Sequence, residues 1–263
     1  MSSPDALPVK ILWTGGWDST FQLLRLLLEE RRPVEPVYLI DEKRRSLRHE
    51  LMAMRMIRQT LNEKYPHTRE LLQIPLFYSL RDIPILESVT EAFKELKTKH
   101  GIGGQYEWLA SFCLHYGVHG LQLCIHRDDK AYPPAKWLTE GEADPATIQS
   151  TPEWKIFSHF QYPILELTKP DMHRIAQEHG WNDLMEMTWF CHRPVHDLPC
   201  GQCNPCQYTI VEGMAHRIPA HRRIRTGFGA LDRNLLRLAS FSYRLTNRTP
   251  ARKKGASQIK PAP

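Results

Sequence analysis

The sequence predicts an α/β fold with a mainly parallel sheet. Short apolar runs alternate with longer segments of helical periodicity, which is the pattern of strand–helix–strand units. A glycine-rich turn joins the first apolar run to the first helical segment. Hydrophobic residues make up 41% and charged residues 24% of the 263 residues, as is typical of a globular chain. We therefore expect helices on both faces of the sheet and ligands at the carboxyl ends of its strands.

Apolar runs and helical spacing predict the individual elements. Strands are expected at residues 9–13, 36–40, 71–77, 121–125 and 162–165. Helices are expected at residues 18–31, 45–64, 105–116 and 169–179, with Gly180 closing the last one. Residues 126–158 show no periodicity, and we expect a long loop there.

Composition excludes some classes of protein. No apolar stretch approaches the roughly 18 residues of a membrane span, so we expect no membrane partner. The N-terminal residues lack the basic and apolar regions of a secretory signal. Both observations favour a cytoplasmic, reducing compartment, where six cysteines suggest metal binding or catalysis before disulfides.

The basic surplus of the chain lies in its C-terminal segment. Residues 216–263 carry 12 Lys or Arg and one acidic residue, whereas the other 215 residues carry 23 basic and 28 acidic groups. Such a segment attracts nucleic acid or remains a solvated tail, and the sequence leaves both open. Apolar residues at helical spacing predict that it packs on the body or on a second subunit of an expected homodimer: Leu231, Leu235, Leu238 and Phe241.

The turn T-G-G-W-D-S-T, residues 14–20, has the features of a phosphate cradle. Its glycines permit backbone conformations closed to other residues and let several N–H groups converge on an anion. The following helix directs the positive end of its dipole at the same point, where two hydroxyl groups add donors. The spacing differs from the Walker A and dinucleotide-binding fingerprints, and the alternative is a tight strand-to-helix turn with an Asp or Ser N-cap. The candidate anion-binding residues are Thr14, Gly15, Gly16, Asp18, Ser19 and Thr20.

Four cysteines have the spacing of a zinc site, C-x8-C-x2-C-x2-C. Four thiolates complete a tetrahedral zinc site with no open position, which implies a structural role, and an iron–sulfur cluster is the alternative. The remaining two, Cys113 and Cys124, are expected to be buried small hydrophobic residues. The expected ligands are Cys191, Cys200, Cys203 and Cys206.

These motifs carry a resemblance to a known family. The glycine turn resembles the PP-loop of ATP pyrophosphatases, usually S-G-G-x-D-S, with Thr14 in place of the first Ser. Together with the cysteine spacing, it resembles the 7-cyano-7-deazaguanine synthase family, known as QueC. Residues 163–206 are similar to that family's L-T-K-x-E-I helix, its T-W-S-C and its zinc loop. The resemblance covers residues 10–207 and is thin in the middle.

The resemblance implies a Rossmann-like PP-loop fold and an ATP-dependent ligase. Members of the family adenylate the carboxylate of 7-carboxy-7-deazaguanine and convert it with ammonia to an amide and then a nitrile. By resemblance, Lys169 contacts the ATP phosphates and Asp18 orients the loop or holds Mg²⁺. The same resemblance offers Arg48 and His49 as catalytic residues. The substrate-binding residues that it implies are Gln105, Asp128, Asp129 and Tyr132.

The sequence departs from the family in the segment that faces the substrate. The last Asp of the family's D-Y-S-G-Y-P-D is Pro134 here, and the family's Tyr-Gly-Gln is replaced at residues 42–44. Three alternatives therefore stay open. The chain could couple the activated acid to an amine of a partner protein, as QueC-like enzymes of antiphage systems do. It could modify tRNA, or it could be a zinc protein that binds nucleotide without catalysis.

The resemblance and the charge pattern divide the chain into four regions. A tail low in apolar residues is expected to be unfolded at the end of the chain. The expected regions are a PP-loop ATP-binding domain at 8–190, a zinc-binding loop and helix at 191–215, a basic helical extension at 216–248 and the tail at 249–263.

Overall fold

The computed structural model describes residues 7–140 and 144–223. In these residues five strands form one sheet in the order β3-β2-β1-β4-β5, and every neighbouring pair is parallel. The strands are β1 (Val9–Leu12), β2 (Val34–Ile40), β3 (Leu76–Ser79), β4 (Leu121–Gln122) and β5 (Phe160–Gln161). The α/β class and the parallel sheet expected from the sequence are thus confirmed.

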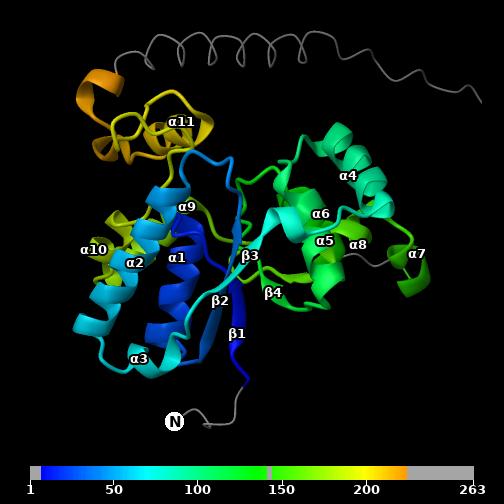
Figure 1. Cartoon of the computed structure of the whole chain (residues 1–263), viewed down its shortest axis with the longest axis horizontal. Coiled ribbons are helices and arrows are strands. Elements are labelled where there is room, and N and C mark those ends of the chain that lie inside the picture. Colours follow the sequence, from blue (N-terminus) through cyan, green and yellow to red (C-terminus); the bar gives the residue numbers. More distant parts are fainter. Residues whose placement is uncertain (1–6, 141–143, 224–263) are drawn as a thin grey trace, which may run out of the picture.

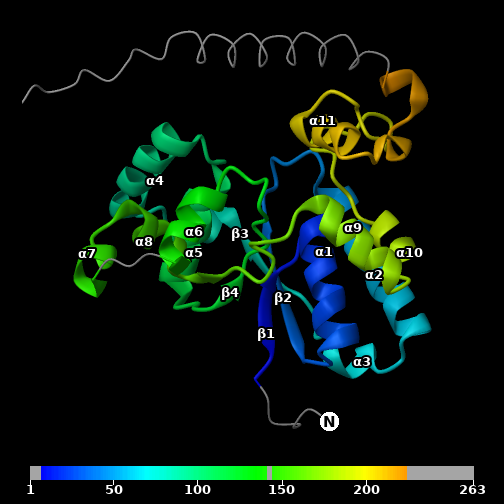
Figure 2. The ribbon, with the colours of Figure 1, turned by 180° about the vertical axis from the view of Figure 1, so that it is seen from behind.

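Helices from distant parts of the chain cover one face of the sheet (Figures 1 and 2). Their apolar side chains meet in one core that includes Phe21, Ile57, Leu61 and Met172. The first helix runs on into a π-helical turn at Arg25–Glu29. The helices of this layer are α1 (Trp17–Leu24), α2 (Leu47–Lys64), α3 (Thr68–Leu71), α9 (Lys169–Glu178) and α10 (Asn182–Glu186).

The opposite face is covered by helices from the middle of the chain (Figure 1). Phe93, Leu96, Phe112 and Phe157 belong to the core on this side, and all four are buried. The helices are α4 (Glu87–His100), α5 (Gln105–Tyr116), α6 (Tyr132–Glu140), α7 (Pro145–Gln149) and α8 (Pro152–Phe157). The sheet therefore has a helical layer on each face.

The last described part of the chain lies beyond the carboxyl ends of the strands, near α9 (Figure 1). It contains α11 (Asn204–Val211) and a 3₁₀ turn at Ala215–Arg217. Only residues 216–223 of the basic extension are described. The predicted helix through Leu231 and Phe241 and the predicted tail lie outside the described residues.

The prediction of a long loop at residues 126–158 is wrong, because three short helices, α6, α7 and α8, occupy much of this segment. The side chain of Asp144 accepts from two N–H groups at the start of α7, and Thr151 accepts from one at the start of α8. A proline follows each of these N-caps, at the first helical position that favours it. Capping and proline thus start α7 and α8, which are too short to show a periodicity.

Three other expectations shift with the structure. The strand predicted at 71–77 begins only at Leu76, because α3 and Pro75 precede it, and β4 ends at Gln122. The strand predicted at 162–165 lies instead at Phe160–Gln161, where Pro163 lacks the N–H group that would extend the ladder. Helix α4 is not among the predicted elements, although its apolar residues have helical spacing. Among the described residues, no helix is long and apolar enough to cross a membrane.

A buried polar cluster joins β2 to the start of α2. The hydroxyl of Tyr38 donates to Glu50 Oε2 over 2.8 Å, and Ser46 Oγ donates to Glu50 Oε1 over 2.7 Å. Arg44 Nε lies 3.3 Å from the same carboxylate. Burial, and after it the negative charge of Glu50, raises the pKa of Tyr38 well above its usual value of 10.0. Tyr38 therefore keeps its proton in the folded protein at a pH where the unfolded chain loses it.

Replacing Tyr38 by Phe should change how stability depends on alkaline pH. Above pH 10 the unfolded wild type releases the Tyr38 proton and the folded one does not, so its free energy of unfolding falls by up to about 1.4 kcal/mol per pH unit. Tyr38→Phe removes that contribution, although it loses about 1 kcal/mol at neutral pH with the hydrogen bond. Urea unfolding at about pH 9 and about pH 11 measures both effects. The prediction would be contradicted if the free energy of unfolding fell by the same amount between the two pH values in the wild type and in Tyr38→Phe.

Candidate functional site

The glycine turn lies where the order of strands reverses. β1 is the first strand and pairs with β2 on one side and with β4 on the other, so the chain leaves it in opposite directions. Parallel sheets bind ligands in the crevice beyond the carboxyl ends of such strands. The turn between β1 and α1 lies at this edge of the sheet and lines a cavity.

Position 15 requires a glycine, because of its backbone conformation and the closeness of α2. Its φ is +68°, and a Cβ there would lie 2.9 Å from the carbonyl oxygen of Glu50 in α2. Gly16 differs, because its φ of −82° is ordinary and its Cβ would lie 3.3 Å from Thr14 Oγ1. Gly15 therefore lets the turn rest on α2, whereas Gly16 keeps the entrance of α1 open.

The N-terminus of α1 is available to an anion. Gly16 is its N-cap, and no side chain caps the N–H groups of the first turn. A cavity of about 130 Å³ lies in front of it. The carboxylate oxygen Oδ1 of Asp18 is buried and has no hydrogen-bond partner. The lining residues are Leu12, Thr14, Gly16, Asp18, Ser19, Leu123 and Cys124.

Cys124 is partly buried and packs against the core, as expected, and it also lines this cavity. Burial, and after it the charge of Asp18, raises the pKa of its thiol, so the thiol stays protonated. Thr20 differs from the other residues predicted in the turn. It is fully buried, and its hydroxyl accepts a hydrogen bond from Trp13 Nε1 at 3.0 Å. Its side chain therefore does not line the cavity.

Lys169 is the first residue of α9 and lies among carboxylates. Its Nζ is 3.2 Å from Glu212 Oε2, and both side chains are largely buried. Burial lowers the pKa of Lys169, but the charges of Asp18, Glu212 and Asp129 outweigh it and the pKa is raised. The ammonium group therefore stays charged. Lys169, Asp18 and Asp129 are therefore close enough for their charges to interact, and we call them one electrostatic group. From the sequence they are predicted as a phosphate ligand, a residue of the glycine turn and a substrate residue.

The other predicted substrate residues are less closely grouped. Asp129 Oδ1 accepts from the N–H of Ala131 at 2.8 Å, which holds it at a turn before α6. The hydroxyl of Tyr132 contacts Glu166 instead, at 3.2 Å. Gln105, at the start of α5, and Asp128 are exposed. Their part in binding substrate stays a prediction.

Arg48 and His49 separate although they are adjacent in α2. Arg48 is exposed, and the described part of the chain gives its side chain no ion pair. The ring of His49 stacks on Trp189 with 4.4 Å between ring centroids, and its Nε2 lies 3.0 Å from Asp197 Oδ1. Its Nδ1 is buried without a partner. His49 thus contacts residues 189–218, which carry the four predicted metal ligands and are called the cysteine-rich segment below, while Arg48 faces solvent.

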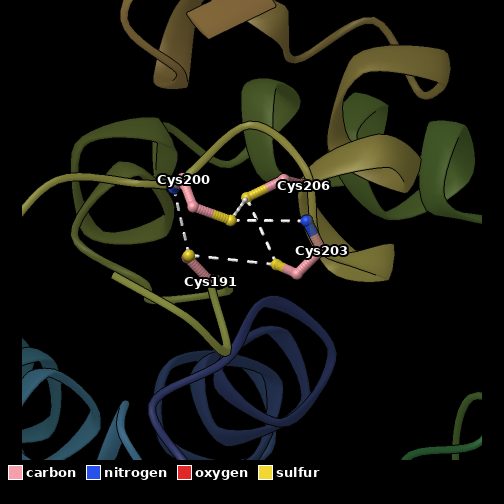
Figure 3. A group of neighbouring side chains, drawn as sticks. All are labelled: Cys191, Cys200, Cys203 and Cys206. Atoms are coloured by element: carbon pink, nitrogen blue, oxygen red, sulfur yellow. Dashed lines mark hydrogen bonds between the residues drawn. The ribbon is translucent and has the colours of Figure 1, made fainter. Parts of the chain in front are cut away.

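The four predicted cysteine ligands converge on one point (Figure 3). Their sulfur atoms all lie within 4.8 Å of one another, and three of the distances are 3.5, 3.9 and 3.9 Å. A tetrahedral zinc site with Zn–S bonds of about 2.3 Å needs sulfur atoms about 3.8 Å apart. The set, Cys191, Cys200, Cys203 and Cys206, could therefore hold a metal ion such as zinc.

The backbone around the cysteines favours thiolates. The N–H groups of Gln202 and Cys203 donate to Cys200 Sγ at 3.4 and 3.3 Å, and the N–H of Cys200 donates to Cys191 Sγ at 3.2 Å. Contacts among the sulfur atoms lower the pKa of Cys203 and raise the pKa of Cys191 and of Cys206. Since thiolates are the form that binds metal, this environment fits a metal ion.

Contacts that the sequence did not reveal connect this cluster to the glycine turn. The N–H of Trp189 donates to the carbonyl oxygen of Gly15 at 2.8 Å. The guanidinium of Arg217 lies 5.4 Å from the ring centre of Trp17 and 4.9 Å from that of Phe190. These residues lie far apart in the sequence, and no spacing rule relates them.

Comparison with known proteins finds no match to this chain. No family model, no curated protein and no solved structure matches this chain.

One metal ion per chain should be bound by the cysteine cluster, and zinc is the expected metal. Cys203→Ser should lose it and lower the melting temperature, because metal binding contributes directly to the folding of a small segment. Metal analysis and thermal unfolding measure the two effects. Cys124→Ser is the control and should keep the metal. Well-folded protein without metal, or a stoichiometric iron–sulfur absorption, would contradict the prediction.

The two glycines should differ in their tolerance of alanine. Gly15→Ala places a Cβ against the Glu50 carbonyl at positive φ and should cost more than about 2 kcal/mol of stability. Gly16→Ala should cost less than about 1 kcal/mol, because its φ is ordinary and Thr14 can shift. Denaturant unfolding of the two variants tests this. A similar loss in both would show that the turn does not rest on α2 as described.

Proposed function

We propose that this chain is an ATP-dependent, AMP-forming carbon–nitrogen ligase with a PP-loop fold. It adenylates the carboxylate of 7-carboxy-7-deazaguanine and converts it with ammonia to the amide and then the nitrile. The observation that carries the proposal is the uncapped N-terminus of α1, which faces a cavity at the reversal of strand order. The unpartnered Asp18 oxygen and the charged Lys169 add the groups that a metal-bound polyphosphate needs.

The reaction requires activation, because a carboxylate is a poor electrophile. A carboxylate oxygen attacks the α-phosphorus of ATP, the bond to the β-phosphate breaks, and pyrophosphate leaves. Ammonia then attacks the acyl carbon, AMP departs with the carboxylate oxygen, and a proton is released. Adenylation of the amide oxygen by a second ATP, followed by loss of AMP and protons, forms the nitrile.

In this proposal the protein acts mainly by positioning and by neutralising charge. The N–H groups at Gly16 and beyond would bind the pyrophosphate portion, with the hydroxyls of Thr14 and Ser19 beside them. Lys169 would neutralise charge as pyrophosphate leaves. Asp18 would hold Mg²⁺, which prefers carboxylate and phosphate oxygens and would offset further negative charge.

The deazaguanine would lie beside Asp129. A carboxylate can accept from the ring N–H and the exocyclic amine of such a base, and Asp129 belongs to the electrostatic group around Lys169. Gln105, Asp128 and Tyr132 would border it from α5 and the start of α6. Zinc in the cysteine cluster would hold the cysteine-rich segment in its fold, without a part in the chemistry.

Isotope exchange between pyrophosphate and ATP tests the first half of the reaction. The wild type should catalyse exchange only when 7-carboxy-7-deazaguanine is present. Asp18→Asn should lower the rate by about 100-fold, the size of effect seen when one preorganised charge-stabilising group is lost. Asp183→Asn is the matched control, because among the described residues that exposed carboxylate on α10 pairs with Lys64 alone.

Two results would contradict the proposal. ATP binding without any acid-dependent exchange would identify a nucleotide-binding protein without catalysis. Exchange that is unchanged in Asp18→Asn would remove this cavity from the reaction. Mass analysis of the products from ATP, the acid and ammonia then distinguishes nitrile formation from a reaction that stops at the adenylate or the amide.

A further inference from the structure

The outer face of α2 is rich in arginine and faces solvent. Arg48 and Arg55 lie two helical turns apart on this face, and Gln59 continues it one turn later. Between them lie Met52 and Met56, which are about half exposed and carry no charge. The buried residues of α2 are on the opposite side and fill the core against the sheet. This face therefore has no packing role among the described residues.

A cavity of about 420 Å³ lies at the C-terminal end of this face, between α2 and α3. Every side chain that lines it is polar or charged, and three of them are guanidinium groups. The lining residues are Arg55, Arg58, Gln59, Asn62, Glu63 and Arg69.

Backbone carbonyls hold two of these arginines in place. Arg58 donates to the carbonyl oxygens of Gln73 and Leu72 at 2.6 and 2.9 Å, and Arg69 Nε donates to that of Asn62 at 3.2 Å. Each keeps further N–H groups that these bonds do not use. Arg55 is exposed and has no hydrogen bond or ion pair within the described residues. The guanidinium groups are thus partly ordered before any ligand binds.

The charge of the cavity is poorly balanced. Glu63 is the one acidic side chain in its lining, and its Oε1 accepts from Gln59 Nε2 at 2.9 Å. No described carboxylate pairs with Arg55, Arg58 or Arg69, although ion pairs are common elsewhere on the described surface. Three arginines against one carboxylate leave a positive surface that is complementary to an anionic partner.

We propose that this surface, the arginine face of Arg48, Arg55, Arg58 and Arg69, binds the phosphodiester backbone of a nucleic-acid duplex. The planar guanidinium group matches phosphate oxygens with paired donors, which lysine does not. Along α2, Arg48 and Arg58 are about 15 Å apart. A duplex presents about nine phosphates over that length of its axis.

Other partners fit this surface less well. The lining has no aromatic side chain on which unpaired bases could stack, so a single strand gains little beyond its charge. A protein partner would normally bury apolar and aromatic contacts at the centre of the interface, and here every residue that lines the hollow is polar or charged. Contacts to phosphate alone imply binding without base specificity and with a steep dependence on salt. The inference is independent of the proposed ligase reaction.

Fluorescence anisotropy with a labelled duplex of about 20 base pairs tests the proposal on the full chain. Each arginine that contacts a phosphate contributes about 0.9 to the magnitude of the slope of log K against log salt concentration. Arg55→Gln combined with Arg69→Gln should therefore reduce the slope by about 1.8. Arg55→Lys keeps its charge and should leave the slope unchanged.

The control variant is Arg174→Gln, an exposed arginine that pairs with Glu178 on α9 and should not alter the slope. Arg55→Gln alone guards against misfolding, since that side chain makes no described contact, and it should reduce the slope by about 0.9. An unchanged slope in the double variant would overturn the proposal and assign any binding to the basic residues beyond Arg223. Binding of polyglutamate or of pyrophosphate with the same dependence on Arg55 and Arg69 would also overturn it, because the site would then serve an acidic protein or a small anion.

Discussion

The hydrogen bond from the Trp189 N–H to the Gly15 carbonyl oxygen joins the glycine turn to the segment that carries the four cysteines. Gly15 belongs to the turn that opens α1, and Trp189 lies two residues before the first cysteine of the cluster. The bond depends on the positive φ of Gly15 and on the absence of a Cβ, which lets the turn rest on Glu50 of α2. The position of the cysteine-rich segment and the shape of the glycine turn are therefore linked.

Other contacts reinforce this link from both sides. Arg217 lies between Trp17 and Phe190, and its Nε is 3.2 Å from Glu186. His49 stacks on Trp189 and binds Asp197. The segment itself has only a small buried core around Cys191, Cys206 and Ile218. A metal ion at the cysteines would stabilise the segment where apolar burial is limited. The contacts of Trp189 and Arg217 would then also restrict the conformation of the glycine turn.

Charge is arranged around the turn before any ligand is present. Lys169 interacts with Asp18, Glu212 and Asp129, so its ammonium group stays charged despite its burial. The N-terminus of α1 adds a positive dipole end that no side chain satisfies. Asp18 lines the small cavity, and its negative charge interacts with the ammonium group of Lys169. On α2, by contrast, arginines outnumber carboxylates, which suits a larger polyanion without a metal.

The sequence by itself determined the α/β class, the parallel sheet, the start of α9 at Lys169 and the four cysteines that meet. These features depend on local patterns: apolar periodicity, a Thr N-cap before Lys169, and close cysteine spacing. Only the tertiary structure decided that Cys124 lines the cavity, that Thr20 is turned toward Trp13, and that Trp189 contacts Gly15. It also produced three helices where no periodicity was visible: Asp144 and Thr151 cap α7 and α8, and α8 packs against both α4 and α6. Such contacts join residues far apart in the chain, and they follow from how the layers pack, which no local pattern encodes.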